Sequence, residues 1–524
     1  MKSAELVSRK DGRVRGARRR VSAFLGLAFI GASIGALLWG CAALMFSPGV
    51  GVTPGGQEDI ASARSVIEQG GVPNPESITV EGFLSEHAIP IEQPADAGLV
   101  YAAASAAWNR DFDAFTPLVT VQLGFGTTID RETFHRSDLN LGLVIDRSGS
   151  MGDLIDQRSE TTKLDAVKIA VDRLLAQLTP DDRVSIVTFN SEPQTRLEAA
   201  EGNDIAAIKS ALDEVTADGG TDLADGLRRG LQVVARNSSE GRSDRAILFT
   251  DAQLRLRSEE HVQRFLETMR DYANDEIGTT VFGVGTDFGH EVAYDISQVR
   301  GGNYFFLSDY DRIVSVFDQE FDFLVTPVAY DVTLSVSVPF EFDVVGVYGL
   351  PAEEPFGHSL RLTIPTLFLS TREGGGSVFV RTRAGALVDF QKTNSVATIG
   401  LAYTTVDGAR MSQPTIGTAL PAELDPDAMT SYFENDATKR GVLLLNTALT
   451  LRSACEDVYS GGYYYYFYYD SEAQSRAITR LTEFLDYFDA LAAGLEDQVS
   501  PESRSLSQER ALVEKLLSNL QGTF

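Results

Sequence analysis

The sequence predicts an α/β domain built on a doubly wound parallel sheet, followed by a β-sandwich-like region and a helical C-terminal region. Three changes of pattern along the 524 residues support this prediction. Between residues 139 and 325, short runs that are apolar throughout alternate with amphipathic segments, which is typical of a parallel sheet buried between helix layers. From 328 to about 410, apolar and polar residues alternate with a period of two, as in antiparallel strands. After Pro421, apolar residues recur at helical spacing.

Composition and periodicity divide the chain into successive segments. We predict a signal, lipoprotein leader or transmembrane anchor at 1–46, a flexible Gly/Pro-rich linker at 47–58, an N-terminal mixed segment at 59–138, the α/β domain at 139–325, a β-rich domain at 326–420, and a helical region at 421–524. In the mixed segment we expect a helix at 59–69 and a strand at 118–125. In the α/β domain, we expect strands at 139–145, 184–189, 246–250, 279–284 and 304–307, with helices between them. The C-terminal helices are predicted at 436–457, 471–494 and 506–520.

The N-terminus predicts export and attachment to a membrane. Eight Lys or Arg residues lie among the first 20, against only Glu5 and Asp11, and residues 21–46 carry no charge. A basic segment followed by an apolar one is typical of a secretion signal, and this apolar run is also long enough to span a bilayer. The basic flank stays inside in either case, so the rest of the chain is expected outside the cytoplasm.

The two cysteines have different expected roles. Leu38-Trp39-Gly40-Cys41 resembles a bacterial lipobox, which implies cleavage before Cys41 and a lipid on that residue. Trp39 departs from the small residue usual at its position, and an uncleaved single-pass helix is the alternative. Cys455 lies in a helix-like stretch, where a buried free thiol is expected.

The charge of the chain argues against nucleic-acid binding. The net charge is −29 although the first 20 residues are basic, so the body of the protein is strongly acidic. Phosphate contacts need clustered Lys and Arg side chains, which an acidic body does not supply. The tyrosine-rich tract at 463–469 is either a contact surface for a partner or a loop packed on its own domain.

Oxygen-bearing side chains follow the predicted strands of the α/β domain. Asp146, Ser148 and Ser150 lie two residues apart after the first strand, so in an open loop their oxygens can face one point. Thr221, which precedes a helix, offers a third hydroxyl, and Asp251, after strand 246–250, offers a second carboxylate. Because strands of a parallel sheet end at one edge, we expect these groups to form a site for Mg²⁺, or for Mn²⁺ or Ca²⁺, all of which accept oxygen ligands. The alternative is that Asp146 and the serines only cap the loop and helix that follow.

At these residues the sequence resembles the von Willebrand factor type A (VWA) family, whose fold is Rossmann-like and whose motif is the metal-ion-dependent adhesion site (MIDAS). The resemblance covers roughly 139–325, and all five motif positions match. It implies that Ser148, Ser150 and Thr221 contact the metal directly, while Asp146 and Asp251 act largely through water. Ala252 replaces the Gly that often follows the last Asp in the family.

The flanking sequence is similar to that of bacterial VWA-containing envelope lipoproteins. The similarity covers residues 62–73 and 78–83 before the domain and the strand-rich region after 328. It implies a protein anchored in the bacterial cell envelope, with its body facing the periplasm or the exterior.

The family resemblance implies a binding protein rather than an enzyme. The open position on the metal would accept an Asp or Glu carboxylate from a partner protein. No catalytic residue is assigned, because the five histidines are scattered and the common nucleotide, zinc-protease and nucleophile-elbow motifs are missing. Two alternatives stay open: a scaffold subunit of an envelope complex with a structural metal, and a hydrolase or channel-regulator-type protein, as in the inter-alpha-inhibitor heavy chains and the calcium-activated chloride channel regulators.

Overall fold

The structure is a computed structural model. It describes residues 51–54, 60–112, 117–131, 133–155, 160–252, 258–285, 295–307, 310–350, 357–370, 376–385, 394–424, 431–460, 471–497 and 503–522. Two segments on which the sequence makes predictions lie outside these ranges: residues 21–46, Cys41 among them, and the tyrosine tract at 463–469.

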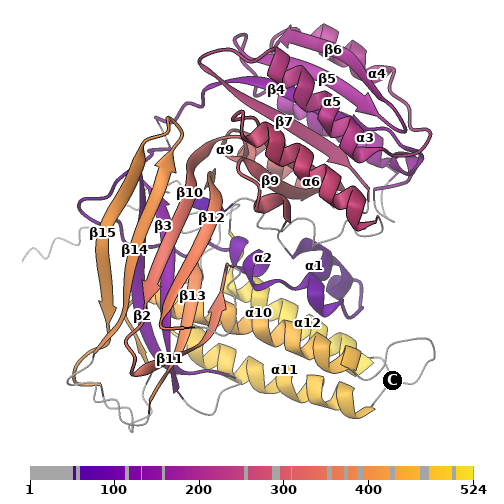
Figure 1. Cartoon of the computed structure of the whole chain (residues 1–524). Helices are drawn as coiled ribbons and strands as arrows, with labels where there is room; N and C mark the ends of the chain where they lie inside the picture. Colours follow the sequence, from indigo (N-terminus) through magenta and orange to yellow (C-terminus); the bar gives the residue numbers. More distant parts are fainter. Residues whose placement is uncertain are drawn as a thin grey trace, which may run out of the picture. The chain divides into compact units, whose positions relative to one another are not determined.

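The α/β domain has a six-stranded sheet in the order β6-β5-β4-β7-β8-β9. Its strands are β4 (Asp138–Asp146), β5 (Arg183–Phe189), β6 (Pro193–Glu201), β7 (Arg242–Thr250), β8 (Gly278–Val284) and β9 (Gly302–Leu307). All neighbours pair in parallel except β6, which runs antiparallel to β5 at one edge (Figure 1). The doubly wound prediction is confirmed, and β6 is a strand that the sequence did not indicate.

Helices cover both faces of this sheet. They are α3 (Lys163–Leu175), α4 (Ile205–Asp213), α5 (Leu223–Arg236), α6 (Glu259–Ala273), α8 (Tyr310–Ser315), the π-helical turn η4 (Val316–Glu320) and α9 (Phe321–Leu324). Apolar side chains of α3, α4 and η4 pack on one face of the sheet. Those of α5 and α6 form a separate core on the other face. Two buried faces explain why the central strands are apolar throughout.

The β-rich region is a ten-stranded antiparallel sheet that the α/β domain interrupts in sequence. Its strands are β1 (Gly51–Pro54), β2 (Val100–Arg110), β3 (Pro117–Thr127), β10 (Pro327–Ser337), β11 (Phe342–Tyr348), β12 (Ser359–Ser370), β13 (Val378–Ala384), β14 (Ser395–Thr405), β15 (Arg410–Ala419) and β16 (Tyr432–Phe433). Strand β3, before the domain, pairs with β13 after it. The segments predicted separately at 59–138 and 326–420 therefore share one sheet, which local patterns cannot reveal because the pairing strands are far apart in sequence.

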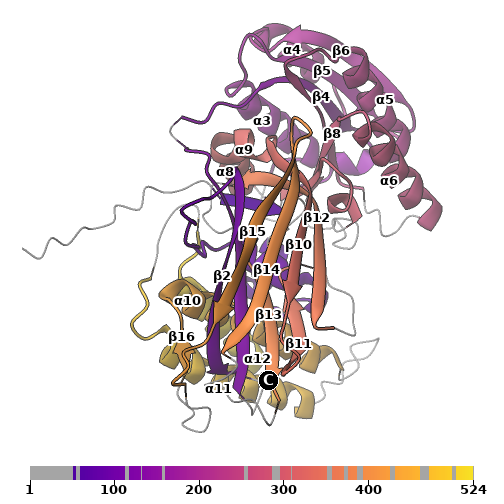
Figure 2. The same ribbon diagram turned by 60° about the vertical axis from the view of Figure 1, so that its left-hand side comes forward.

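Residues 51–54 correct the prediction of a flexible linker at 47–58. They form β1, which pairs antiparallel with β12, and the side chain of Val52 is fully buried. The Gly and Pro content predicted a flexible linker, but residues 51–54 pair with the backbone of β12, which no local sequence pattern predicts. At the end of the sheet, the Gln413 side-chain amide of β15 bonds the backbone N and O of Ala102 in β2 at 2.7 and 2.9 Å. Figure 2 shows β2, β14 and β15 side by side.

A helical layer packs against this sheet. It consists of α1 (Ala61–Glu68), the short turn η1 (Pro75–Ser77), α2 (Val80–Ser85), α10 (Asp436–Ser460), α11 (Ser471–Ala492) and α12 (Leu506–Gly522). These helices share one core with Phe379 of β13, and buried Arg64 of α1 pairs with Glu86 and with Glu509 of α12. Cys455 is free and buried, as predicted. None of the helices that the structure describes is long and apolar enough to cross a membrane.

Contacts at the N-terminal ends of β7 and β9 join the α/β domain to the ten-stranded sheet. The guanidinium of Arg245, at the start of β7, lies 5.2 Å from the ring centre of Phe368 in β12. The backbone N of Gly301, which directly precedes β9, donates to Thr366 Oγ1 of β12 at 2.7 Å. These contacts leave the opposite, C-terminal ends of the parallel strands for a functional site.

Candidate metal centre

The predicted metal-binding residues lie where the strand order of the parallel sheet reverses. Asp146 is the last residue of β4, and Asp251 directly follows β7. These neighbouring strands connect to helices on opposite sides of the sheet, because the order runs β6-β5-β4 in one direction and β7-β8-β9 in the other. In open α/β sheets, ligands bind at the carboxyl ends of the strands beside such a switch point.

Four of the five predicted residues form one chain of hydrogen bonds. The backbone N of Ser148 donates to Asp146 Oδ1 at 2.8 Å, and the hydroxyls of Ser148 and Ser150 lie 3.3 Å apart. Ser150 Oγ donates to Asp251 Oδ1 at 2.9 Å. Asp146, Ser148 and Asp251 are buried, whereas Ser150 is exposed. The cluster is therefore reached from solvent at Ser150.

Thr221 lies on a neighbouring loop that is tied to this cluster through the backbone. The N of Gly149 donates to the O of Gly219 at 3.1 Å, and Gly219 has a positive φ of 79°, which suits glycine. Asp222 follows Thr221 and caps α5 by accepting a hydrogen bond from the N of Asp225 at 3.1 Å. Among the described residues, no hydrogen bond joins the Thr221 hydroxyl to the other four predicted ligands.

The Asp146 carboxyl is buried, and within the described part of the chain no Lys or Arg side chain hydrogen-bonds to it. Thr250 Oγ1 donates to Asp146 Oδ2 at 2.6 Å, and Ser148 N donates to the other oxygen. Burial raises the pKa of Asp146 from 3.8 to about 6, against the opposing effect of these two donors. A bound cation would offset the cost of holding this charge inside the protein.

A lysine that the sequence analysis did not single out also belongs to the cluster. Lys163, the first residue of α3, places its Nζ 2.8 Å from Asp251 Oδ2. Both side chains are buried, with exposed fractions of 8% for Lys163 and 3% for Asp251. Asp251 thus bonds a hydroxyl through one oxygen and an ammonium through the other.

The donor set fits a hard divalent cation. Two carboxylates and two hydroxyls converge at the strand ends, and Mg²⁺, Mn²⁺ and Ca²⁺ are bound in proteins by such oxygen ligands. The described residues contain no group of three or more His, Cys, Asp or Glu side chains able to hold a metal. A site here would therefore depend on hydroxyl oxygens and water as well as carboxylates.

Comparison with known protein families bears on this domain directly. Residues 141–253 match the family model of the von Willebrand factor type A domain. The chain contains a VWA domain. The matched range runs from inside β4 to just beyond Asp251, and it includes all five candidate ligands.

Two curated proteins and a solved structure resemble longer parts of the chain. An uncharacterized Escherichia coli K12 protein, YfbK, is 25% identical over 288 residues, covering 53% of this chain and 47% of that protein. An uncharacterized Synechocystis protein, sll0103, is 26% identical over 214 residues, covering 41% and 48%. This chain thus matches about half the length of these curated relatives. A solved von Willebrand factor type A protein from Catenulispora acidiphila, 14% identical with a TM-score of 0.46, covers 81% of this chain and 98% of its own.

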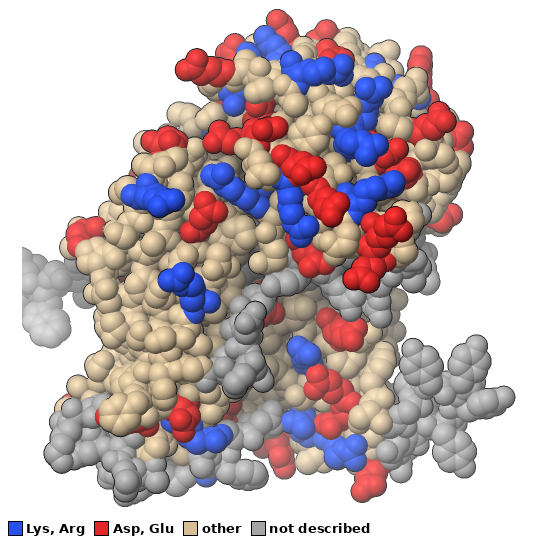
Figure 3. Space-filling view, viewed as in Figure 1, with Lys and Arg blue, Asp and Glu red and all other residues tan. Residues whose placement is uncertain are grey.

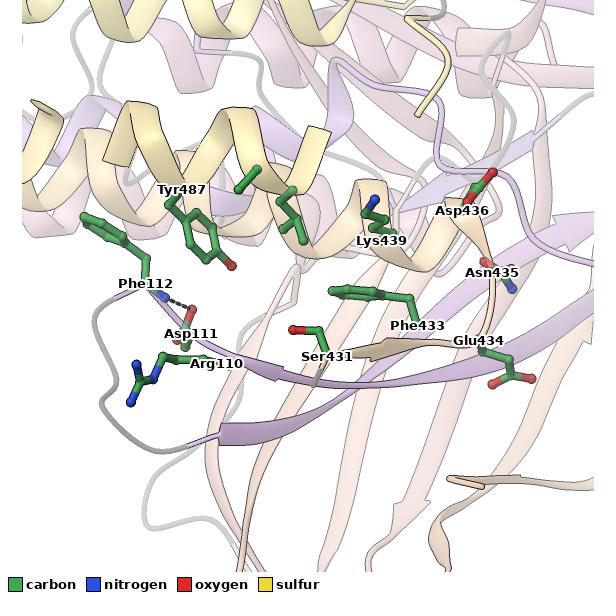
Figure 4. A pocket seen from close by; sticks show the side chains of 12 residues that line it. Arg110, Asp111, Phe112, Ser431, Phe433, Glu434, Asn435, Asp436, Lys439 and Tyr487 are labelled. Atoms are coloured by element: carbon green, nitrogen blue, oxygen red, sulfur yellow. Dashed lines mark hydrogen bonds between the residues drawn. The ribbon is translucent and has the colours of Figure 1, made fainter. Parts of the chain in front are cut away.

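A cavity lies away from the VWA domain, between β2, β16 and α10–α11. Its volume is about 770 Å³, and Figure 4 shows aromatic side chains such as Phe433 and Tyr487 beside charged ones such as Lys439. Several of its polar groups already have partners: Asp111 pairs with Arg381 at 2.6 Å, and Lys439 Nζ donates to Ala493 O at 2.8 Å. The oxygen cluster of the VWA domain is the stronger candidate for a functional site.

The surface of the VWA domain mixes both signs of charge. On the face shown in Figure 3, Lys and Arg side chains alternate with Asp and Glu over the α/β part of the molecule. Ion pairs of the domain include that of Arg173 in α3 with Asp318, at 2.5 Å. Beside the candidate ligands, Arg147 pairs with Asp218 on the loop that precedes Thr221. The charges in these pairs neutralise one another locally.

Proposed function

We propose that the VWA domain binds a divalent cation, Mg²⁺ or else Mn²⁺ or Ca²⁺, and uses it to capture an Asp or Glu carboxylate of a partner protein. The ligands would be Asp146, Ser148, Ser150, Thr221 and Asp251. The observation that carries the proposal is the chain of hydrogen bonds joining two carboxylates and two serine hydroxyls at the switch point of the sheet. Exposure of Ser150 leaves one side of the cluster accessible to a partner.

The surroundings of the cluster support binding rather than hydrolysis. Metal-assisted hydrolysis needs a general base positioned beside the metal's water. Two of the described histidines are engaged elsewhere: His87 Nδ1 lies 2.8 Å from Phe83 O, and His261 Nδ1 lies 2.6 Å from Ser258 Oγ. The residues at the cluster therefore hold and orient charge, and the metal would supply the electrophile that attracts a carboxylate.

The same contacts help to separate this proposal from a scaffold with a structural metal. Asp251 already has an ammonium partner in Lys163, so only the Asp146 carboxylate is left without a cationic partner when the metal is absent. A structural metal would contribute strongly to folding, and chelation would then lower the melting temperature sharply. Under the binding proposal, chelation abolishes partner capture and leaves the VWA domain folded.

The experiment is a Mn²⁺ titration by calorimetry, followed by capture of partners from a bacterial envelope extract with and without EDTA. Asp146→Ala is expected to lose cation binding and EDTA-sensitive capture while circular dichroism stays unchanged. Asp172→Ala is the matched control, because Asp172 lies on the surface of α3 and pairs with Lys209 at 3.0 Å. Capture that ignores both EDTA and Asp146→Ala would refute the proposal.

We also propose that the protein is anchored in the bacterial cell envelope, with its VWA domain outside the cytoplasm. The anchor is either a lipid on Cys41 or a helix formed by residues 21–46, as the basic and apolar N-terminus indicates. Mass spectrometry of the mature N-terminus distinguishes the two. A diacylglyceryl group on Cys41 supports the lipoprotein, whereas an intact Met1 supports the helix. A mature N-terminus beyond residue 46 with no lipid would exclude both.

A further inference from the structure

Lys163 is a buried ammonium that bonds Asp251 of the candidate metal site, and contacts at both ends of the residue hold it in place. Its backbone N donates to Asp153 O at 2.9 Å, which ties the start of α3 to the turn that carries Ser150. Thr162 caps the same helix by accepting from the N of Asp165 at 3.1 Å. Both ends of the residue are thus held, the backbone by the loop and Nζ by Asp251.

The aliphatic part of the Lys163 side chain packs against a glycine that leaves it room. Gly285, directly after β8, has a φ of 92°, and a β-carbon there would lie 2.8 Å from Lys163 Cε. A larger residue at position 285 would push the lysine away from Asp251. Gly285 therefore leaves the space that the Lys163 side chain occupies on its way to Asp251.

The ammonium changes the charge that the site presents after a cation binds. The cluster contains two carboxylates, Asp146 and Asp251, and one ammonium. A divalent cation bound to the carboxylates alone would give a neutral site. With Lys163 in place, the loaded site keeps one net positive charge, and in a buried environment that charge acts strongly on a nearby ligand.

We propose that Lys163 is a built-in counter-ion that weakens cation binding and strengthens the capture of a carboxylate by the loaded site. The proposal rests on the proposed function and names the residue that regulates it. Before loading, Lys163 and the cation compete for Asp251, because both are attracted to the same carboxylate. After loading, the retained positive charge favours an external carboxylate, which completes the neutralisation.

The proposed effects of Lys163 on cation affinity and on carboxylate affinity have opposite signs. This distinguishes the proposal from a purely structural role. If Lys163 only supported the fold of the strand ends, its removal would distort the ligands and weaken both cation binding and carboxylate binding. If Lys163 acts through its charge, its removal strengthens cation binding and weakens carboxylate binding.

The test uses the full chain in detergent with Mn²⁺ and acetate as probes. Free Mn²⁺ is counted by electron paramagnetic resonance, and acetate binding to bound Mn²⁺ is followed by water-proton relaxation. Lys163→Met and Lys163→Gln both remove the charge, and the glutamine retains a hydrogen-bond donor. Lys168→Met is the matched control, since Lys168 lies on the same helix and donates to Val215 O at 2.9 Å, away from the cluster.

Both charge-removing variants are expected to bind Mn²⁺ at least tenfold more tightly than the unchanged protein, and to bind acetate at least threefold more weakly once loaded. Lys168→Met is expected to match the unchanged protein in both measurements. Unchanged Mn²⁺ affinity in both Lys163 variants, or a loss of both affinities, would overturn the role of Lys163 while leaving the metal site intact. If the unchanged protein bound no Mn²⁺ and only the variants did, the proposed function would fail, and only the opposition of Lys163 to cation binding would stand. Absence of binding in all of them would overturn both.

Discussion

Asp146 is one of the groups through which the stability of the metal-free VWA domain depends on pH. Its folded-state pKa, raised by burial to about 6 from 3.8, means that the folded protein holds a proton more readily than the unfolded chain. The stability associated with this group is therefore complete below pH 3.8 and is lost as the pH rises through 6. A shift of about two units corresponds to ~3 kcal/mol, which the ionised carboxylate costs the metal-free fold near neutral pH.

The first prediction follows from this cost. In EDTA at pH 7.5, Asp146→Asn is expected to raise the free energy of unfolding of the VWA domain by up to ~3 kcal/mol, because a neutral amide replaces a buried charge. At pH 4.5 the difference is expected to shrink to a fraction of that value, since Asp146 is then protonated in the folded protein. Thermal melts at the two pH values provide the measurement. A variant that is less stable than the unchanged protein at both pH values would contradict the assignment.

Cation binding is expected to show the complementary pH dependence. The cation needs the ionised form of Asp146, so protons compete with it below the pKa of about 6. The second prediction is that the apparent dissociation constant for Mn²⁺ is constant from pH 7 to 8 and rises about tenfold per pH unit well below 6. Calorimetric titrations from pH 5 to 8 would test it, and a constant affinity across this range would contradict it.

At the scale of elements, helix α5 positions the loop that carries Thr221. Two glycines one helical turn apart, Gly226 and Gly230, let α5 approach the sheet closely. A β-carbon at Gly230 would collide with Val144 of β4, and one at Gly226 would collide with the ring of Phe189 in β5. Close packing of α5 on these two strands brings its N-terminal loop beside the turn after Asp146.

The third prediction concerns this contact. Gly230→Ala is expected to lower the free energy of unfolding by ~1–2 kcal/mol, because overpacking costs ~1–3 kcal/mol and the helix propensity of alanine returns at most about 1 kcal/mol. Cation affinity should fall as well, since the Thr221 loop moves with the helix. Gly522→Ala in α12 is the control, as its β-carbon would meet nothing within 4 Å. Urea unfolding and Mn²⁺ titration measure the two effects, and an unchanged variant would show that α5 tolerates a greater separation.

The sequence predicted most elements of the VWA domain and of the helical layer because their periodicity is strong. The helices predicted at 436–457 and 506–520 are α10 (Asp436–Ser460) and α12 (Leu506–Gly522). Strand β2, by contrast, is rich in alanine, and β6 is half-exposed along its length, so neither shows the apolar pattern of a buried strand. Strand β1 contains Gly and Pro and depends on its neighbours for pairing.

The candidate site was predictable where its proposed ligands directly follow the ends of strands. Asp146, Ser148 and Ser150 form a recognisable motif, and Asp251 follows a clear apolar strand. Lys163 was not predictable, because a lysine at the first turn of an amphipathic helix ordinarily faces solvent. Its role depends on the space beside Gly285, which arises only when α3 and β8 pack together. Thr250 was likewise missed, since it reads as the last residue of a buried strand.

At the scale of the whole molecule, Arg136 ties together the points where the chain enters and leaves the VWA domain. It lies just before β4 and forms a double hydrogen bond to Asp182 at 2.7 and 2.8 Å, and a further bond to Asp322 of α9 at 2.7 Å. Asp182 is fully buried and also accepts bonds from the backbone N of Leu139 and of Thr179. Burial alone would raise the pKa of Asp182, but these donors outweigh it and hold the pKa below its usual value.

The fourth prediction is that Arg136→Met destabilises the VWA domain by about 3 kcal/mol near neutral pH, because it leaves a buried carboxylate without its cation. A carboxyl with a lowered pKa contributes stability above its unfolded value of 3.8, and that contribution is lost as the pH falls through the folded value. The difference from the unchanged protein should therefore narrow on acidification below pH 4. Arg173→Met, which breaks an exposed pair with Asp318, should cost no more than ~1 kcal/mol. Equal losses of stability from Arg136→Met and Arg173→Met in thermal melts would contradict the stabilising role assigned to the buried Arg136–Asp182 pair.

The fifth prediction uses Cys455 as a reporter of the helical layer. Burial raises the pKa of this thiol to about 12, so its reaction with a thiol reagent at pH 8 requires the layer to open. Because the cores of the VWA domain and of the helical layer are separate, EDTA and Asp146→Ala should leave the labelling rate unchanged. Labelling in a variant with Cys41 replaced by serine checks this. A rate that rises on chelation would show that the two parts open together.

The interruption of the ten-stranded sheet by the VWA domain has a consequence for biogenesis. Strands β2 and β3 leave the ribosome early, but β13, which pairs with residues 119–123 on the other edge of β3, begins at Val378, about 250 residues after Thr127. At roughly 5–20 residues per second, translation of that stretch takes about 10–50 s. During this interval β3 keeps an unpaired edge while the VWA domain, whose strands all lie within the intervening stretch, is completed. Nascent chains should therefore show native VWA structure before the sheet closes, with the exposed β3 edge as the point where chaperones are needed.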